Sequence, residues 1–507
     1  MVCNVRSLGL HGVTGYEVSA ECDLSGGLPA FTVVGLPDAA VNEARERVRA
    51  AIKNCGFTFP VSRITVNLAP AHLRKAGTLY DLPMLVGILC AGGQLRLTDR
   101  DCAFVGELSL SGQVRPCAGM LPMALAAKRA GIKALYVPAD SAAEATLAEG
   151  PVVYPVENVR QLAAHLAGET PIAPAPLWQP GDEVLHRLDF ADVKGQEPVK
   201  RALEIAAAGG GHHVLMSGPP GSGKSMLAKR LPGIMPPMTE AETLATSRIH
   251  SVMGLLPSNS PLLRTRPFRS PHHTVSDVGL IGGGTNPRPG EISLAHNGVL
   301  FLDELPEFKR TVLEVLRQPL ENGTISISRA SGSCTFPCEF MLIAAMNPCP
   351  CGHLGDRLHI CRCHQQQIQN YRARISGPLL DRIDLHVELA ALTEDELLAH
   401  NTPAAETSAV IRERVVRARK IQQERFKGTD ITCNGRMGPS EMRKYCQPDA
   451  STESMIRHAI QNFGLSARAY DRILRVARTV ADLDGSETIQ SSHLFEAIGY
   501  RMLDRRT

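Results

Sequence analysis

The sequence lacks a long hydrophobic segment, an N-terminal secretion signal and a strong net charge. No stretch offers the run of about eighteen apolar residues that a membrane-spanning helix needs. Residues 1–6 contain no basic segment that leads into an apolar run. These absences predict a soluble, cytoplasmic protein with no membrane partner. The formal net charge of +3 is too small to imply a nucleic-acid partner by itself.

The composition is that of a globular protein with several domains. A chain of 507 residues is long enough for about two to four domains, and a hydrophobic content of 44% can build ordinary cores. These values exclude a disordered chain. The 14 cysteines occur without a secretion signal, which favours free thiols or metal ligands over a disulfide framework.

The most informative stretch is a phosphate loop. Its residues fill every position of the pattern G-x-x-x-x-G-K-[ST]: Gly218, Pro219, Pro220, Gly221, Ser222, Gly223, Lys224 and Ser225. The apolar run 213–216 before the loop predicts a buried strand, and residues 226–230 after it predict a helix. In that setting the N–H groups of the helix N-terminus bind phosphate oxygens. The pattern therefore predicts ATP binding, with Lys224 at the β- and γ-phosphates and Ser225 as a ligand of Mg²⁺.

A second nucleotide element follows a strand that we expect to be buried on both faces. The apolar run 299–302 predicts this strand, which delivers Asp303 and Glu304 at its C-terminal end. Asp303 fits as a partner of Mg²⁺, and Glu304 fits as the base that orients the attacking water. Paired acids after a strand are usually a solvated turn. Beside a phosphate loop they predict hydrolysis of a nucleoside triphosphate.

Residues 1–168 show mixed α and β patterning. Alternation predicts strands at 14–24, 30–35 and 62–68, and apolar spacing predicts helices that begin at Asp38 and at residue 80.

This block resembles the catalytic domain of Lon proteases, whose chemistry needs a serine nucleophile and an activating lysine. The corresponding stretch, residues 76–84, contains no serine, and we expect the nearby Lys75 to be a surface charge. The block is therefore predicted to be a non-proteolytic scaffold. A Pro/Ala-rich segment at 169–189 predicts a linker after it.

Residues 190–392 are predicted to form the ATPase core, an α/β domain with hairpin insertions. The stretch around Gln196 resembles the entry box of AAA+ ATPases. Prolines and a glycine cluster in residues 266–284 predict an insertion or mobile loop rather than core. Residues 323–332 alternate like a hairpin with Arg329 near its tip. A tip arginine is usually a solvated charge, but in a ring it would point toward the central channel and contact DNA.

A buried run at 340–346 predicts a further strand, which ends at Asn347. AAA+ proteins place their first sensor of the γ-phosphate at this point. A combination of five features resembles the magnesium chelatase/MCM branch of AAA+ ATPases. These features are the phosphate loop, the pair Asp303–Glu304, Asn347, the Arg329 hairpin and residues 379–384. With the Lon-like block in front, the chain resembles the ComM/YifB family of magnesium-chelatase-like proteins.

The resemblance implies a hexameric ATPase. For ComM it implies a DNA helicase that drives branch migration during recombination in natural transformation, with single-stranded or branched DNA as the partner. It also implies that Arg382 is the arginine finger donated to a neighbouring subunit, with Arg374 as the alternative. An AAA+ chaperone that remodels a protein complex, as in magnesium chelatase, is the second reading. A Lon-type protease is disfavoured by the missing serine.

Residues 393–507 are predicted to form a helical lid. A basic amphipathic helix at 410–421 is at least as consistent with an exposed helix face as with DNA contact. Ser466 can cap a later helix that carries Arg468 in its first turn, where a cation is unfavourable unless an anion is near. In the family pattern Arg468 is the second sensor.

A cysteine cluster lies in an insert at residues 349–364. It consists of two C-x-C pairs formed by Cys349, Cys351, Cys361 and Cys363. Four soft ligands brought together by a hairpin suit a structural Zn²⁺ ion, although the spacing is tighter than the usual C-x₂₋₄-C. A reduced cysteine-rich loop or a redox-sensitive site is the alternative.

Overall fold

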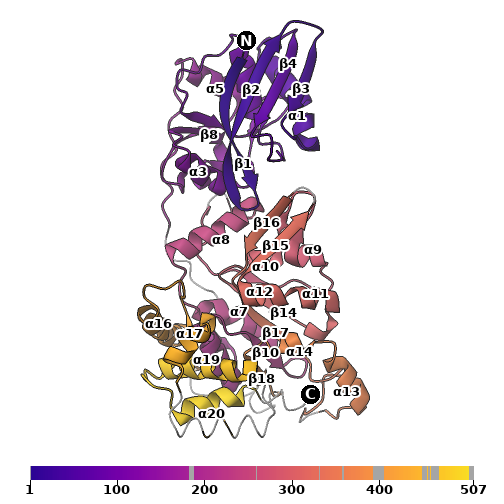
Figure 1. Cartoon of the computed structure of the whole chain (residues 1–507), viewed down its shortest axis with the longest axis vertical. Coiled ribbons are helices and arrows are strands. Elements are labelled where there is room, and N and C mark those ends of the chain that lie inside the picture. The colour runs from indigo at the N-terminus through magenta and orange to yellow at the C-terminus, as the bar shows by residue number, and fades with distance from the viewer. Residues whose placement is uncertain are drawn as a thin grey trace.

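The computed structural model describes residues 2–181, 188–257, 260–329, 332–356, 359–391, 405–447, 454, 457 and 467–501. Figure 1 shows an elongated molecule, with the N-terminal sheet at one end and the C-terminal helices at the other. The predicted fold class is confirmed, because an α/β core with hairpin insertions lies between an N-terminal α+β part and a helical C-terminal part. None of the helices within the described ranges is long and apolar enough to cross a membrane.

A seven-stranded mixed sheet organises the N-terminal part, in the order β3-β4-β2-β1-β5-β8-β9. Its strands are β1 (Val2–His11), β2 (Thr14–Ser25), β3 (Ala30–Val34), β4 (Arg63–Ala69), β5 (Cys102–Phe104), β8 (Ala134–Pro138) and β9 (Val152–Val156). The remaining elements are the hairpin β6 (Glu107–Leu108) with β7 (Val114–Arg115), and the helices α1 (Ala39–Asn54), α2 (Asp81–Ala91), α3 (Met120–Arg129), α4 (Ala142–Thr146) and α5 (Val159–Leu166). The predicted strands at 14–24, 30–35 and 62–68 are confirmed as β2, β3 and β4. Helix α1 begins as predicted, because Asp38 Oδ1 accepts a hydrogen bond from the N–H of Val41 at 2.9 Å.

Lys75 is not the surface charge that the sequence predicted. Its side chain is buried, and its ammonium group donates to the carbonyl oxygens of Pro70 and, at 2.8 Å, Leu73. Burial lowers its pKa. The carbonyls replace the water that the cation loses, which makes Lys75 a structural residue of the loop before α2.

The ATPase core is built on a five-stranded sheet in the order β11-β14-β17-β10-β18. The strands are parallel: β10 (Val214–Ser217), β11 (Phe268–Arg269), β14 (Val299–Leu302), β17 (Met341–Met346) and β18 (Leu385–Glu388). Its helices are α6 (Glu197–Gly209), α7 (Lys224–Ile234), α8 (Glu240–Val252), α11 (Arg310–Val315), α12 (Arg317–Asn322), α13 (Gln365–Arg372) and α14 (Gly377–Leu380). The expectation that 266–284 lies outside the core is wrong for β11, since Phe268 pairs with Val299 of the central sheet.

Two hairpins are inserted in this core. One is formed by β12 (Gly282–Gly283) and β13 (Arg288–Pro289) between the short helices α9 (Asp277–Ile281) and α10 (Glu291–Leu294). The other is the predicted hairpin, formed by β15 (Thr324–Arg329) and β16 (Gly332–Pro337). The residues between these two strands, 330–331, lie outside the described part of the chain.

The described C-terminal part is helical. Its helices are α16 (Ser408–Arg425), α17 (Pro439–Tyr445), α19 (Ala467–Leu483) and α20 (Ser491–Gly499). Two of them, α16 and α19, pack against α6. Ile411, Val415 and Ala418 of α16 are buried, so the apolar stripe of the predicted basic helix faces the protein. The cap residue Ser466 lies outside the described residues.

The N-terminal sheet touches the ATPase core at the turn between β1 and β2 and at α8 (Figure 1). His11 Nε2 lies 3.4 Å from Cys334 Sγ of β16. The guanidinium of Arg248 in α8 donates to the carbonyl of Val13 at 3.1 Å. Ser251 of α8 also donates to the Glu144 carboxylate.

Buried histidines around the central sheet make stability depend on pH. Burial is the main cause that lowers the pKa of His212 and His296 to about 4 and that of His213 and His386 to about 3. His213 also accepts a hydrogen bond at Nδ1 from the N–H of Leu342 at 3.1 Å, next to the phosphate-loop strand. These side chains are neutral in the fold and take up protons on unfolding.

Because the folded pKa values lie below the usual value near 6.5, the stabilising contribution is present above that pH and is lost as the pH falls toward 4. We expect the free energy of unfolding to fall by up to about 5 kcal/mol per pH unit near pH 5. Urea unfolding between pH 7.5 and 5 measures this slope. His213→Asn keeps an acceptor and should flatten the slope by roughly one histidine's share, whereas the exposed His364→Asn should not. An unchanged slope in His213→Asn would contradict the prediction.

Candidate nucleotide site

The phosphate loop joins a buried strand to a helix, as predicted. All four residues of β10 are buried, and α7 begins at Lys224, inside the motif. Gly221 and Gly223 have φ values of +76° and +92°, a region that glycine adopts without strain. The Gly218 N–H donates to the carbonyl of Met346 at 3.2 Å, which fixes the start of the loop to the end of β17.

Lys224 holds the loop in its present conformation. Its Nζ donates to the carbonyls of Gly218 and Pro219 at 2.7 and 2.8 Å, and it lies 3.3 Å from Asn347 Oδ1. Burial lowers the pKa of this ammonium group. The structure thus brings together the predicted lysine and the predicted first sensor, although 123 positions separate them.

Ser225 and Asp303 meet beside Lys224. The Ser225 hydroxyl donates to Asp303 Oδ2 at 2.7 Å, and Asp303 Oδ1 accepts from the N–H of Glu304 at 3.0 Å. A hydroxyl next to a carboxylate offers the hard oxygen ligands that Mg²⁺ prefers. These two residues therefore fit the predicted magnesium position.

Glu304 has a left-handed backbone conformation, with φ +52° and ψ +47°. Its carboxylate is about half exposed, and Oε2 lies 3.1 Å from Nδ1 of His273. Sequence reasoning missed His273, which lies four residues after β11. The pair His272–His273 within a proline-rich insertion was the available signal.

The remaining predicted residues lie elsewhere in the isolated chain. Arg382 is 6% exposed, and its guanidinium bonds the Glu321 carboxylate and the Pro378 carbonyl. The half-exposed Arg374 pairs with Glu307 at 2.9 Å, three residues after Glu304. Arg468 lines a separate cavity of about 370 Å³ together with Glu321 and other residues.

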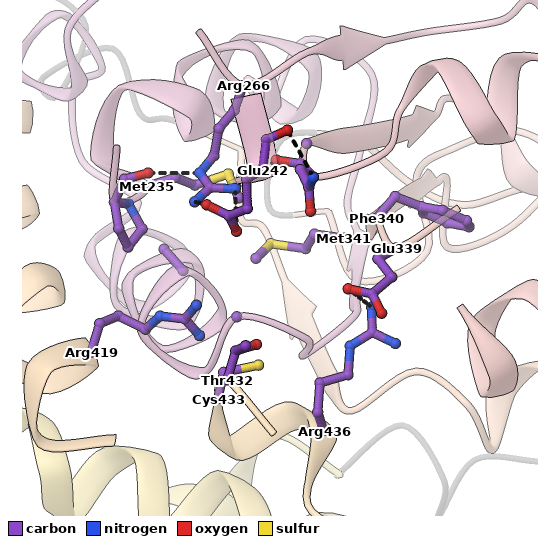
Figure 2. A pocket seen from close by; sticks show the side chains of 15 residues that line it. Met235, Glu242, Arg266, Glu339, Phe340, Met341, Arg419, Thr432, Cys433 and Arg436 are labelled. Atoms are coloured by element: carbon purple, nitrogen blue, oxygen red, sulfur yellow. Dashed lines mark hydrogen bonds and ion pairs between the residues drawn. The ribbon is translucent and has the colours of Figure 1, made fainter. Parts of the chain in front are cut away.

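A smaller cavity, of about 40 Å³, lies between the central sheet and the C-terminal part (Figure 2). Arg266 pairs with Glu242 on one side of it at 3.1 Å, and Arg436 pairs with Glu339 on the other at 3.7 Å. Arg266 is also enclosed by backbone carbonyls. The pair Arg436–Glu339 connects the core to the segment that follows α16, and none of the lining residues belongs to the phosphate loop.

The four cysteines of the insert converge. The Sγ atoms of Cys349, Cys351 and Cys361 lie 3.4 to 3.7 Å apart, and Cys363 completes a group whose ligand atoms all lie within 4.8 Å of one another. Tetrahedral Zn²⁺ with Zn–S bonds of about 2.3 Å requires sulfur separations of about 3.8 Å. Backbone N–H groups of His353 and Arg362 lower the pKa of Cys351 to about 6, whereas burial and the neighbouring thiols raise the pKa values of Cys361 and Cys363, so without an ion the group favours a thiolate at Cys351. The 14 cysteines, all within the described part of the chain, form no disulfide in the structure.

The cysteine insert packs directly on the phosphate loop. A β-carbon added to Gly352, which has φ +86°, would lie 2.7 Å from Cδ of Pro220 and 3.9 Å from Cγ of Asn347. This approach leaves no room for a side chain at position 352. The conformation of the insert is therefore tied to that of the loop that contacts phosphate.

Comparison with known proteins agrees with this arrangement. Residues 189–397 match the family described as "Magnesium chelatase, subunit ChlI", residues 20–141 match "Subunit ChlI of Mg-chelatase", and residues 405–501 match "Magnesium chelatase, subunit ChlI C-terminal". Fold and site thus define a magnesium-chelatase-like protein of the AAA+ class.

Two full-length similarities are more specific. The chain is 45% identical to Competence protein ComM of Haemophilus influenzae over 500 residues, which cover 97% of this chain and 96% of ComM. It is 43% identical to protein YifB of Salmonella typhimurium over 495 residues, again covering 97% and 96%. The chain therefore belongs to the ComM/YifB family.

Two other proteins are similar to parts of this chain. DNA replication licensing factor Mcm6 of Drosophila melanogaster is 24% identical over 226 residues, which are 43% of this chain and 26% of Mcm6. Lon protease 2 of Bacillus subtilis is 28% identical over 165 residues, which are 30% of this chain and 29% of that protease.

The contact between Gly352 and Pro220 predicts a strong effect of Gly352→Ala. The added methyl group has to displace the phosphate loop, and we expect the ATPase rate to fall by about 10-fold or more, since small misplacements of a reactive geometry are costly. Gly355→Ala is the matched control, because Gly355 has a similar φ of +80° and no atom within 4 Å of an added β-carbon. Equal rates in the two variants, at equal metal content, would contradict the prediction.

Proposed function

We propose that this protein hydrolyses ATP and uses the energy to move on single-stranded or branched DNA as a ring of six identical subunits. The observation that carries the proposal is the meeting of Lys224, Ser225, Asp303 and Asn347 at one edge of the sheet. The cellular role we propose is branch migration during recombination in natural transformation, in the cytoplasm. The full-length similarity to a protein named for competence supports this role.

In the proposed reaction each residue at the sheet edge has a distinct task. Lys224 exchanges its carbonyl partners for the β- and γ-phosphate oxygens, and Ser225 and Asp303 hold Mg²⁺. When bound, Mg²⁺ neutralises charge that develops on the phosphate oxygens. Glu304 orients the attacking water, and Asn347 hydrogen-bonds that water or the γ-phosphate. Arg468 is proposed as the second sensor.

The two inserted hairpins form the proposed DNA-facing surface. A β-carbon added to Gly283 would lie 3.4 Å from a guanidinium nitrogen of Arg329, so the tips of both hairpins are neighbours. Arg288, which pairs with Gly283 across the β12–β13 hairpin, is exposed, as is Arg329. Two exposed cations suit the negative charge of a phosphate chain. The partial similarity to a protein named as a DNA replication factor supports DNA as the partner.

We propose that the four cysteines bind one structural Zn²⁺ ion.

We also propose domain boundaries at 1–168 for the Lon-like part, 169–189 for the linker, 190–392 for the ATPase core and 393–507 for the lid. The apolar core of the ATPase begins at Phe190, which supports the limit at 190, whereas the core of the N-terminal part includes Ile172, four residues into the proposed linker. The buried, carbonyl-bonded Lys75 supports a non-proteolytic role for the first domain.

A second candidate function is the remodelling of a protein complex, as a magnesium-chelatase type of ATPase. The family descriptions that match the chain favour it. The two candidates use the same nucleotide site and differ in what stimulates hydrolysis.

DNA is expected to stimulate the ATPase, with forked or branched DNA more effective than duplex DNA.

Glu304→Gln should bind ATP and DNA but lose turnover by about 10²-fold or more, because the amide cannot act as a base. Arg329→Ala should weaken binding and reduce the slope of log K against log salt by about 1. ATPase assays with each DNA form and binding titrations at several salt concentrations measure these effects. An ATPase that no form of DNA stimulates would favour the remodelling function.

An arginine finger acts only when a second subunit supplies it. We expect Arg382→Ala to bind ATP and to hydrolyse it about 10³-fold more slowly. Mixing Arg382→Ala with Lys224→Ala should restore activity in part, since some boundaries then combine an intact loop with an intact arginine. Arg382 must break its contact with Glu321 to reach a neighbouring subunit. The alternative finger, Arg374, is therefore tested by mixing Arg374→Ala with Lys224→Ala. If mass measurements confirm mixed rings and only the Arg374 mixture recovers activity, the finger is Arg374.

A further inference from the structure

The cysteine insert contains a second group of metal-ligating side chains that the four-cysteine site does not use. Nδ1 of His353 lies 2.9 Å from Asp356 Oδ2, and Nδ1 of His359 lies 3.2 Å from the same oxygen. The two imidazole rings lie side by side, with centroids 4.7 Å apart. The candidate ligand atoms of the three residues all lie within 4.8 Å of one another.

The three side chains have the chemistry and spacing of a transition-metal site. Imidazole nitrogen and carboxylate oxygen both bind ions such as Zn²⁺ and Co²⁺ at about 2.0–2.2 Å. In a tetrahedral site such bonds separate the ligand atoms by about 3.4 Å. The two observed separations are only slightly shorter, so small rotations of the rings admit an ion.

The environment of each ligand also fits. The Asp356 side chain is 3% exposed, whereas His353 and His359 are 32% and 64% exposed. A buried carboxylate beneath two partly exposed imidazoles provides negative charge at the bottom of an accessible position. The four thiols already supply four ligands to their own site, so these histidines are not needed to close it.

We infer that His353, Asp356 and His359 bind a second divalent transition-metal ion, with a fourth coordination position open to solvent. The first ligand follows directly after Gly352, the residue that contacts Pro220 of the phosphate loop. An ion at this site joins residue 353 to residue 359 and so fixes the outer part of the insert. The inference does not depend on the proposed motor function or on the ion of the four cysteines.

The test counts ions on the full-length protein. After equilibration with excess Zn²⁺ and gel filtration, elemental analysis should find one ion per subunit fewer in His353→Ala/His359→Ala than in the wild type, which is one against two when the four cysteines also hold an ion. His364→Ala is the matched control, since His364 is an exposed histidine of the same insert, and it should retain both ions. Asp356→Asn keeps an acceptor for both rings but is a poorer ligand, and its affinity for Co²⁺ at this site should fall by more than about 10-fold, since even outer-shell changes cost about 10- to 100-fold.

Cobalt spectra separate the two sites. The thiolate site gives strong sulfur-to-metal charge-transfer absorption, and the imidazole–carboxylate site gives only weak visible bands, which should persist in Cys349→Ser/Cys351→Ser. Equal ion counts in the wild type and the double histidine variant would overturn the inference. Loss of an ion from His364→Ala would also overturn it, because it would indicate scattered binding to surface histidines. A merely hydrogen-bonded histidine pair predicts that Asp356→Asn leaves cobalt binding unchanged.

Discussion

The hydrogen bond from Ser225 to Asp303 is the contact on which the nucleotide site depends, because it joins the first turn of α7 to the residue that follows β14, 78 positions later in the chain. Its geometry is set by register. Leu302 of β14 lies opposite Ala344 of β17, and Ser217 of β10 lies opposite Met346, so the residues after each strand emerge at one edge. A shift of one residue in either pairing would turn Asp303 or Asn347 to the other face of the sheet. The apolar side chains that fix these registers therefore also fix the spacing of the polar groups at the edge.

Glu304 shows how the insertion before β12 is connected to this edge. A left-handed conformation costs a non-glycine residue roughly 1–2 kcal/mol, so the surrounding structure must enforce it. The Asp303 carboxylate accepts from the Glu304 N–H, and His273 faces the Glu304 side chain from the segment after β11. That segment leads through α9 to Gly283, beside Arg329. The chain segment 273–283 thus connects the neighbourhood of the hairpin tips to a residue that touches the predicted base.

The sequence was most informative where a function occupies consecutive residues. The phosphate loop and the pair Asp303–Glu304 could be placed on strand ends because four-residue apolar runs precede them. The strand β1 escaped prediction because Ser7, Leu8 and Gly9 are buried in succession, which breaks the period of two. A strand of two residues, such as β11, is too short to show a periodicity. Its pairing with β14 is evident only in the folded sheet.

Contacts between residues far apart in the chain explain why other side chains lie where the sequence did not predict them. Lys75 is buried because the preceding loop turns its carbonyls inward, and Arg382 is buried because Glu321, 61 positions earlier, reaches it. Neither contact has a local signal. The convergence of His353 and His359 on Asp356 did have a local signal, namely the spacing H-x₂-D-x₂-H. The prediction of a metal site considered only the cysteine pairs on either side of it.

The position of α8 gives the N-terminal sheet a structural link to the nucleotide site. A short connection follows α7, the helix that begins with the phosphate-loop lysine, and α8 then runs to the N-terminal part, where Arg248 and Ser251 contact Val13 and Glu144. The same N-terminal turn touches the second hairpin through His11 and Cys334. One end of the N-terminal sheet is therefore attached to two elements of the ATPase core, α8 and the second hairpin. The contact with the hairpin involves more than the thiol and the imidazole, because a β-carbon added to Gly12 would lie 3.6 Å from Phe336 and Val13 packs against the apolar core of the ATPase. The turn between β1 and β2 also receives the hydrogen bond from Arg248 of α8, so the N-terminal sheet meets both elements at this one turn.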